Sequence, residues 1–87
     1  MRDWSEDEVR LTVHDYFNML EYELAGRRYS KAEHRAELLA RLDNRSKGAV
    51  ERKHQNISAV LAKDGLRYIS GYKPLGNIQH ILKKHVQ

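Results

Sequence analysis

The sequence predicts a small all-α domain of about four helices that contains a helix-turn-helix, and two kinds of observation support this prediction. Apolar residues recur at steps of three and four over several stretches, which is the spacing of one face of a helix. Several of these stretches follow a Ser and precede a Gly, as helix starts and ends commonly do. The 87 residues have the length of one domain, which we place at 1–87.

The first helix is expected at about residues 6–25. Ser5 and Glu8 have the spacing of a capping box, and Trp4 and Val9 have that of a hydrophobic staple. Gly26 follows as a C-terminal stop. The apolar stripe of this helix comprises Val9, Val13, Tyr16, Phe17, Leu20 and Leu24.

Two further helices are expected at about residues 31–42 and 46–63, joined by a tight turn. Ser30 and Glu33 repeat the capping-box spacing, and Ser46 is a residue type that caps helix starts. A helix, a short turn and a second helix make up the helix-turn-helix motif. The apolar residues of the third helix fall on one face: Val50, Ile57, Val60 and Leu61.

The C-terminal part of the chain is less regular. Residues 66–70 fit either a short extended segment or a loop, and the sequence leaves both open. Residues 71–76 are rich in Gly and Pro, which indicates a loop. A fourth helix is expected at about residues 76–86, because helical spacing returns in Ile78, Ile81, Leu82 and Val86.

Charge is distributed unevenly along the chain. The net charge of +4 results from −5 over residues 1–26 and +9 over residues 27–87. A basic surface of this kind favours a polyanionic partner such as nucleic acid. No apolar run approaches the ~20 residues that cross a bilayer, and the acidic N-terminus does not resemble a signal peptide. We therefore expect no membrane partner and a cytoplasmic location.

The sequence offers no catalytic or metal-binding constellation. It has no Cys, and its five His residues do not pair at the helical steps that favour a shared metal ion. Neither a glycine-rich phosphate loop nor a nucleophile elbow occurs. We therefore expect no enzyme activity in this chain, no metal ion, no cofactor and no small-molecule substrate.

The third helix is the candidate for reading DNA bases in the major groove. Gly48, Arg52 and Gln55 lie almost opposite its apolar face, and Lys47 lies at its start. Arg and Gln can form paired hydrogen bonds with guanine and adenine, while a Gly lets the backbone approach closely. We predict that these four residues read double-stranded DNA. A solvated helix surface without a partner is the interpretation that competes with this one.

Phosphate contacts are expected around the same motif. Arg45 and Ser46 lie where the turn meets the helix start, and the N–H groups of a helix start favour phosphate. Further phosphate contacts are predicted from the start of the second helix and from the Gly/Pro-rich loop. Those residues are Arg27, Arg28, Lys31 and Lys73. Such contacts make DNA binding weaken as salt rises, because binding releases counterions.

Several motifs of the chain resemble those of an N-terminal module of bacterial restriction and defence proteins. They are Trp4-Ser-x-Asp-Glu8, Asp15-Tyr-Phe-x-Met-Leu20, Glu23-Leu-Ala-Gly26, Tyr29-Ser-Lys-Ala-Glu-His34, Gly71-Tyr-Lys-Pro74 and, most specifically, the segment 44–61. In those proteins the module precedes an HNH nuclease or another effector domain, as in McrA-like modification-dependent endonucleases. The resemblance covers nearly the whole chain. It implies a helical DNA-binding or targeting module whose nuclease residues would lie beyond this chain.

A protein-interaction or dimerisation module is the alternative function. Leu11 and Tyr22 lie off the apolar stripe of the first helix, and they would form a homodimer surface together with the apolar side of the fourth helix. RNA binding has less support, since the sequence has neither an RNP-like aromatic pattern nor a Gly-x-x-Gly clamp.

Overall fold

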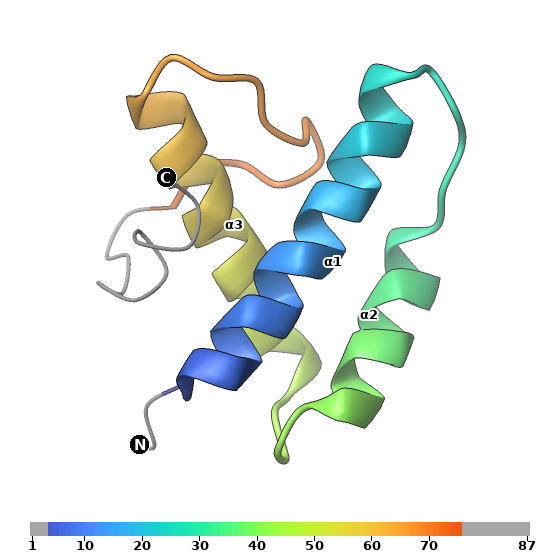
Figure 1. Cartoon of the computed structure of the whole chain (residues 1–87), viewed down its shortest axis with the longest axis vertical. Helices are drawn as coiled ribbons and strands as arrows, with labels where there is room; N and C mark the ends of the chain where they lie inside the picture. Colours follow the sequence, from blue (N-terminus) through green and yellow to red (C-terminus); the bar gives the residue numbers. More distant parts are fainter. Residues whose placement is uncertain (1–3, 76–87) are drawn as a thin grey trace.

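A computed structural model of the chain describes residues 4–75, which form three helices. They are α1 (Glu6–Leu24), α2 (Lys31–Arg41) and α3 (Lys47–Lys63). Helices α1 and α2 lie side by side in opposite directions, and α3 crosses behind α1 (Figure 1). Each helix packs against the other two. The all-α prediction is confirmed for residues 4–75, and the fourth helix expected at 76–86 lies outside the described residues.

The helices begin where their Ser residues predict. Ser5 and Glu8 form both hydrogen bonds of a capping box, at 3.1 Å each. The side chain of Ser30 accepts from the N–H of Glu33, and that of Ser46 accepts from the N–H of Ala49. Each of these bonds satisfies an N–H that the first helical turn would otherwise leave unpaired.

Glycine residues end α1 and α3 by the same backbone motif. Gly26 and Gly65 have φ values of 69° and 73°, in the left-handed region that favours glycine. The next residue then bonds back into the helix, from the N–H of Arg27 to Tyr22 O and from the N–H of Leu66 to Leu61 O, both at 2.9 Å. These are Schellman caps, which confirm both predicted helix ends.

The core consists of two clusters that meet around α1. The larger one joins α1 to α3 and to the segment after α3 and contains Val9, Val13, Tyr16, Met19, Leu20, Ile57, Leu61, Ile69 and Tyr72. The smaller one, of Leu38, Leu42 and Val50, packs against Trp4, Leu11 and Leu39 and joins α2 to the start of α3. Leu11 is therefore a partly buried contact between helices.

The apolar stripe predicted for α1 is wrong at one position. Leu24 is 50% exposed, whereas Met19, which lies off the predicted stripe, is fully buried. Thr12 is also fully buried, and its hydroxyl donates to Glu8 O at 2.8 Å. The helical period identifies a face, but it does not show how far the neighbouring elements extend along that face.

The segment that follows α3 is a folded loop. Residues 64–75 contain no strand, and residues 66–69 have no regular secondary structure. The hydroxyl of Tyr16 accepts from the N–H of Ile69 at 2.9 Å and shares a hydrogen bond of 2.7 Å with Ser58 Oγ. The N–H of Leu75 donates to Gln55 O at 3.1 Å, which returns the loop to the middle of α3. Hydrogen bonds of this kind hold an irregular backbone in one conformation.

Among residues 4–75, none of the helices is long and apolar enough to span a bilayer.

Candidate nucleic-acid interface

Helix α3 has one broad buried side and one narrow exposed side. Its buried residues are Val50, Lys53, His54, Asn56, Ile57, Ser58, Val60 and Leu61. Three of the predicted base-reading residues, Lys47, Gly48 and Arg52, are exposed, and Gln55 is half-buried. Glu51 is exposed beside them. The four predicted residues therefore share the open side of α3, but a carboxylate that sequence reasoning left out accompanies them.

The start of α3 has an open approach for a ligand. A Cβ atom added to Gly48 would meet no atom within 4 Å. The first bond of the helix backbone runs from the N–H of Val50 to Ser46 O at 3.2 Å. The N–H groups of Lys47 and Gly48 precede that bond, at the positive end of the helix dipole. Lys47, Gly48 and the neighbouring backbone thus form a surface suited to an anion.

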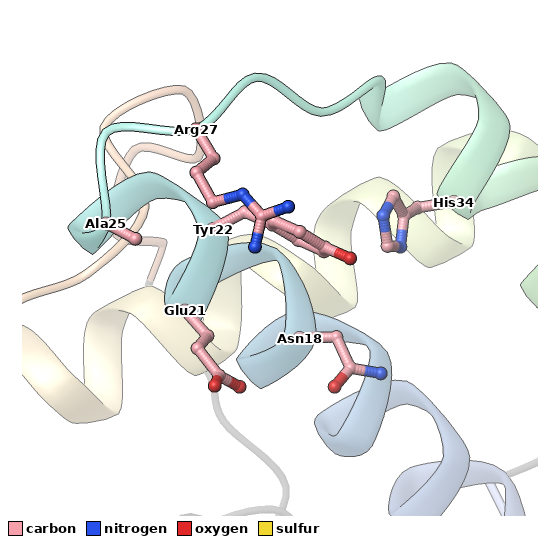
Figure 2. Close-up of a pocket in the computed structure, with 6 residues that line it drawn as sticks. All are labelled: Asn18, Glu21, Tyr22, Ala25, Arg27 and His34. Atoms are coloured by element: carbon pink, nitrogen blue, oxygen red, sulfur yellow. The ribbon is translucent and has the colours of Figure 1, made fainter.

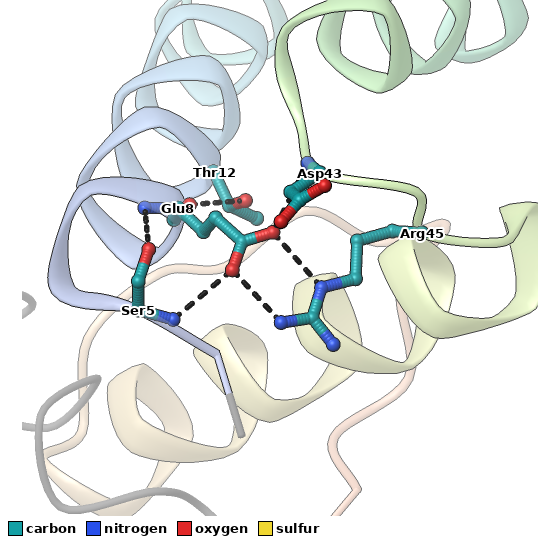
Figure 3. A network of polar contacts seen from close by, with 5 residues as sticks. All are labelled: Ser5, Glu8, Thr12, Asp43 and Arg45. Carbon is teal, nitrogen blue, oxygen red and sulfur yellow. Dashed lines mark hydrogen bonds and ion pairs between the residues drawn. The ribbon is translucent and has the colours of Figure 1, made fainter. Parts of the chain in front are cut away.

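Arg45 takes part in a buried network that ties the turn before α3 to the first turn of α1. Its guanidinium donates from Nε to Glu8 Oε2 at 2.9 Å and from Nη2 to Glu8 Oε1 at 2.8 Å (Figure 3). The N–H groups of Ser5 and Asp43 donate to the same carboxylate at 3.1 and 3.3 Å. The side chains of Arg45 and Glu8 are only 9% and 10% exposed. Arg45 therefore holds α3 in place relative to α1.

The network also involves Trp4. The guanidinium carbon of Arg45 lies 4.8 Å from the centre of the Trp4 ring, and Lys53 Nζ lies 4.9 Å from it. Cations over an indole face are attracted by its quadrupole. Hydrogen bonds from the Arg45 side chain, assisted by those from Ser5 and Asp43 and opposed by burial, lower the pKa of Glu8 to about 2. Glu8 is thus a carboxylate at any ordinary pH, which keeps the pair charged.

Of the other predicted phosphate contacts, Ser46 is exposed at the start of α3, where its side chain accepts from the N–H of Ala49 at 3.1 Å, and the remaining four lie toward the opposite end of α1. Arg27 and Arg28 are exposed in the connector after α1, and Lys73 is exposed in the loop after α3. Lys31 is half-buried, and its Nζ donates to Gly71 O at 3.1 Å and lies 4.5 Å from the centre of the Tyr72 ring. Helix α1 spans roughly 28 Å from its first turn to its last. The predicted base contacts and these remaining phosphate contacts therefore face different ends of the molecule (Figure 1).

A polar cluster that sequence reasoning missed joins the middle of α1 to the first turn of α2 and to the middle of α3. Asp15 Oδ1 accepts from His34 Nδ1 at 2.8 Å, and Asp15 Oδ2 lies 3.3 Å from His54 Nε2. His54 is fully buried, and its ring packs 4.8 Å from the ring of Tyr72, centre to centre. In the described part of the chain, neither ring nitrogen of His54 has a hydrogen-bond partner of good geometry. No group of three or more candidate ligands among residues 4–75 is arranged to hold a metal ion.

Hydrogen bonding also fixes the loop beside α1. Burial works to raise the pKa of Glu23, but hydrogen bonds from Ser70 and Tyr29 hold it below its usual value. The N–H of Ser70 and the hydroxyl of Tyr29 donate to Glu23 at 3.0 and 2.8 Å. Burial raises the pKa of Tyr72 to about 12, so this hydroxyl stays protonated. Neutral donors, the Ser70 N–H and the Tyr29 hydroxyl, thus tie the loop and the connector to the Glu23 carboxylate.

Comparison with known proteins found no matching family model, no similar curated protein and no similar solved structure.

Proposed function

We propose that this chain is a duplex-DNA-binding module in which α2, the turn at 42–46 and α3 act as a helix-turn-helix. The observation that carries the proposal is the open face at the start of α3, where Lys47, Gly48 and Arg52 are exposed. A recognition helix requires one face in the core and the opposite face free to enter the major groove. The burial of Val50, Ile57 and Leu61 supplies the first requirement.

The role of each residue follows from its position on α3. Arg52 is proposed to donate a pair of hydrogen bonds to a guanine edge, and Gln55 to bond an adenine edge. Glu51 is suited to accept from a cytosine amino group, which would turn an unfavourable charge into a specific contact. Lys47 and the first N–H groups of α3 are proposed to bind the flanking phosphate. Arg45 is left out of this set because its guanidinium binds Glu8.

The proposed biological setting is a targeting module of a restriction or defence protein, on the strength of the motif resemblance alone. In that setting the module would deliver an HNH nuclease or another effector, and it would have no catalytic role itself. A preference for modified bases would then be tested by comparing methylated and unmethylated duplexes.

The test is a fluorescence-anisotropy titration of duplex DNA at two salt concentrations. The duplexes are random, methylated and unmethylated. We expect the logarithm of the binding constant to fall linearly with the logarithm of the salt concentration, with a slope of about −0.9 for each phosphate contact. An affinity that is the same at both salt concentrations would contradict the proposal.

Arg52→Ala tests the recognition face directly. We expect a loss of about tenfold in specific affinity, because a good bidentate base contact contributes about 1–3 kcal/mol. The matched control is Arg10→Ala, which removes another exposed cation that pairs with Asp7 at 3.0 Å in the acidic first turn of α1. If Arg52→Ala and Gln55→Ala leave binding intact while Arg27→Ala with Arg28→Ala abolishes it, α3 is not the reader.

A protein-interaction module is the second candidate, and exposed apolar side chains favour it. Leu24, Leu66 and Tyr68 are 50%, 56% and 38% exposed, and all three lie where α1 and α3 end. Sedimentation velocity separates the two candidates. A tight dimer that forms with or without DNA, and shows no DNA affinity, would favour protein interaction.

A further inference from the structure

A polar pocket opens between the C-terminal half of α1, the connector after it and the first turns of α2. Its volume is about 420 Å³, and its lining residues are Asn18, Glu21, Tyr22, Ala25, Arg27 and His34 (Figure 2). This volume lies within the range of small-ligand sites. The pocket lies at the opposite end of α1 from the Glu8–Arg45 pair, so it is separate from the start of α3.

His34 is held in a fixed orientation at one wall of this pocket. Asp15 Oδ1 lies 2.8 Å from His34 Nδ1. An ionised carboxylate can only accept, so Nδ1 carries the proton of this bond. The other ring nitrogen, Nε2, is then left for a ligand: it accepts from an O–H when the ring is neutral and donates when the ring is protonated. The ring of Tyr29 packs edge-on against His34 at 6.0 Å and limits its rotation.

Arg27 is held at the facing wall. Its guanidinium carbon lies 5.2 Å from the centre of the Tyr22 ring, and Figure 2 shows the group beside that ring. A cation–π contact of this kind leaves N–H donors of the guanidinium available for a ligand. Within residues 4–75, Arg27 forms no ion pair with a carboxylate.

We propose that this pocket binds a phosphate group, with Arg27 as the charged donor and His34 Nε2 as the oriented second contact. The Tyr22 hydroxyl points toward His34, and the Asn18 amide lies below it, which adds two neutral groups to the same space (Figure 2). Two carboxylates are close. Asp15 is engaged by His34 and lies next to His54, and the Glu21 carboxylate is directed away from His34 (Figure 2). A guanidinium and a phosphate form strong, geometrically matched hydrogen bonds.

The phosphate can come from the DNA backbone or from a free phosphate ester. The proposed DNA-reading face of α3 does not contribute to the pocket, so the two proposals can fail independently. In the first case the pocket would extend the DNA footprint along α1; in the second it would be a separate ligand site.

The experiment is an NMR titration of the whole chain with inorganic phosphate, at constant pH and ionic strength, with chloride as the reference anion. The readouts are the ring carbon-bound protons of His34 and the backbone amide of Arg27. We expect saturable shifts with a Kd of about 1–10 mM, which is the weak end of specific binding. Arg27→Ala should weaken this binding at least tenfold. The matched control, Arg28→Ala, removes the neighbouring exposed cation that does not line the pocket, and it should leave the shifts unchanged.

A second titration with duplex DNA identifies the source of the phosphate. If Arg27→Ala also weakens DNA binding and inorganic phosphate competes with DNA at His34, the pocket binds the DNA backbone. If DNA binding is unchanged while the phosphate shift is lost, the pocket takes a free phosphate ester. Shifts that do not saturate, or that are equal in Arg27→Ala and Arg28→Ala, would overturn the proposal. Both substituted residues are exposed, so thermal melting by circular dichroism should match the unsubstituted chain.

Discussion

The two ends of α1 are held by different chemistry. At its N-terminal end, a buried ion pair between Glu8 and Arg45 fixes the turn before α3. At its C-terminal end, the loop after α3 is held by hydrogen bonds from the Ile69 N–H to the Tyr16 hydroxyl and from the Ser70 N–H to Glu23. The comparison teaches that a basic residue cannot be assigned to DNA by charge alone. Arg45 is occupied by a partner 37 positions away, whereas Arg27 at the other end remains exposed.

The largest expected effect comes from breaking the ion pair between Glu8 and Arg45 at the N-terminal end of α1. Glu8→Gln keeps the size of the side chain but leaves the buried Arg45 charge without its carboxylate. We expect a loss of about 3 kcal/mol in the free energy of unfolding, which is typical of a broken buried pair. Chemical denaturation measures it, with Asp7→Asn as the control because Asp7 is 83% exposed in the same helical turn. Equal stability of Glu8→Gln and Asp7→Asn would mean that the pair does not fix this end.

Acid should weaken the same end selectively. The pKa of Glu8 is lowered to about 2 in the folded chain from an ordinary 4.5. A lowered folded-state pKa contributes stability above the unfolded pKa, and that contribution disappears as pH falls from about 4.5 to about 2. The stability difference between the unsubstituted chain and Glu8→Gln should therefore shrink across this window in thermal melts. A difference that stays constant down to pH of about 2 would show that Glu8 is not the group responsible.

The attachment of the loop after α3 to α1 is tested by Tyr16→Phe. The change removes the acceptor for the Ile69 N–H and the partner of the Ser58 hydroxyl, both buried. We expect a loss of about 2 kcal/mol in unfolding free energy, because buried donors without partners are costly. Tyr68→Phe is the matched control, since Tyr68 is 38% exposed on the loop that contains Ile69. The loss for Tyr16→Phe should not vary between pH values of about 2 and 5, in contrast to Glu8→Gln.

Substitutions of two glycines should give the smallest changes in the free energy of unfolding, with opposite signs for Gly48 at the start of α3 and Gly26 after the end of α1. Gly48→Ala should stabilise the fold by about 0.5 kcal/mol, because Ala favours helix and its Cβ meets no atom within 4 Å. Gly26→Ala should destabilise it by about 1 kcal/mol, because φ is 69° there.

Under the proposed function, Gly48→Ala should also weaken DNA binding severalfold, since the added methyl group occupies the face that approaches DNA. Unchanged affinity in Gly48→Ala would argue against close approach at this position.

Local features of the fold could be predicted from the sequence, because they depend on nearby residues. The capping box of Ser5 and Glu8 and the glycine stops at Gly26 and Gly65 are all present. These motifs span three to six residues, so their geometry follows from the helix itself. The open side of α3 was also predictable, since Gly48 and Arg52 lie opposite a regular apolar face.

The contacts between helices could not be predicted in the same way. Glu8 has the spacing of a capping residue, and nothing in its neighbourhood shows that its carboxylate also binds Arg45 across 37 positions. Asp15, His34 and His54 come from three different helices, so no short motif connects them. One available signal was the helical spacing: Asp15 lies four positions after Leu11, so the two share a face of α1 that is separate from the predicted stripe.

The most direct measurement of the central claim is an NMR map of backbone amide shifts during titration with duplex DNA. The proposal that the start of α3 enters the major groove predicts the largest shifts at Lys47, Gly48 and Arg52, with smaller shifts at Arg27 if its pocket binds the backbone. Large shifts confined to Arg27 and Arg28, or no saturable shifts anywhere, would contradict it.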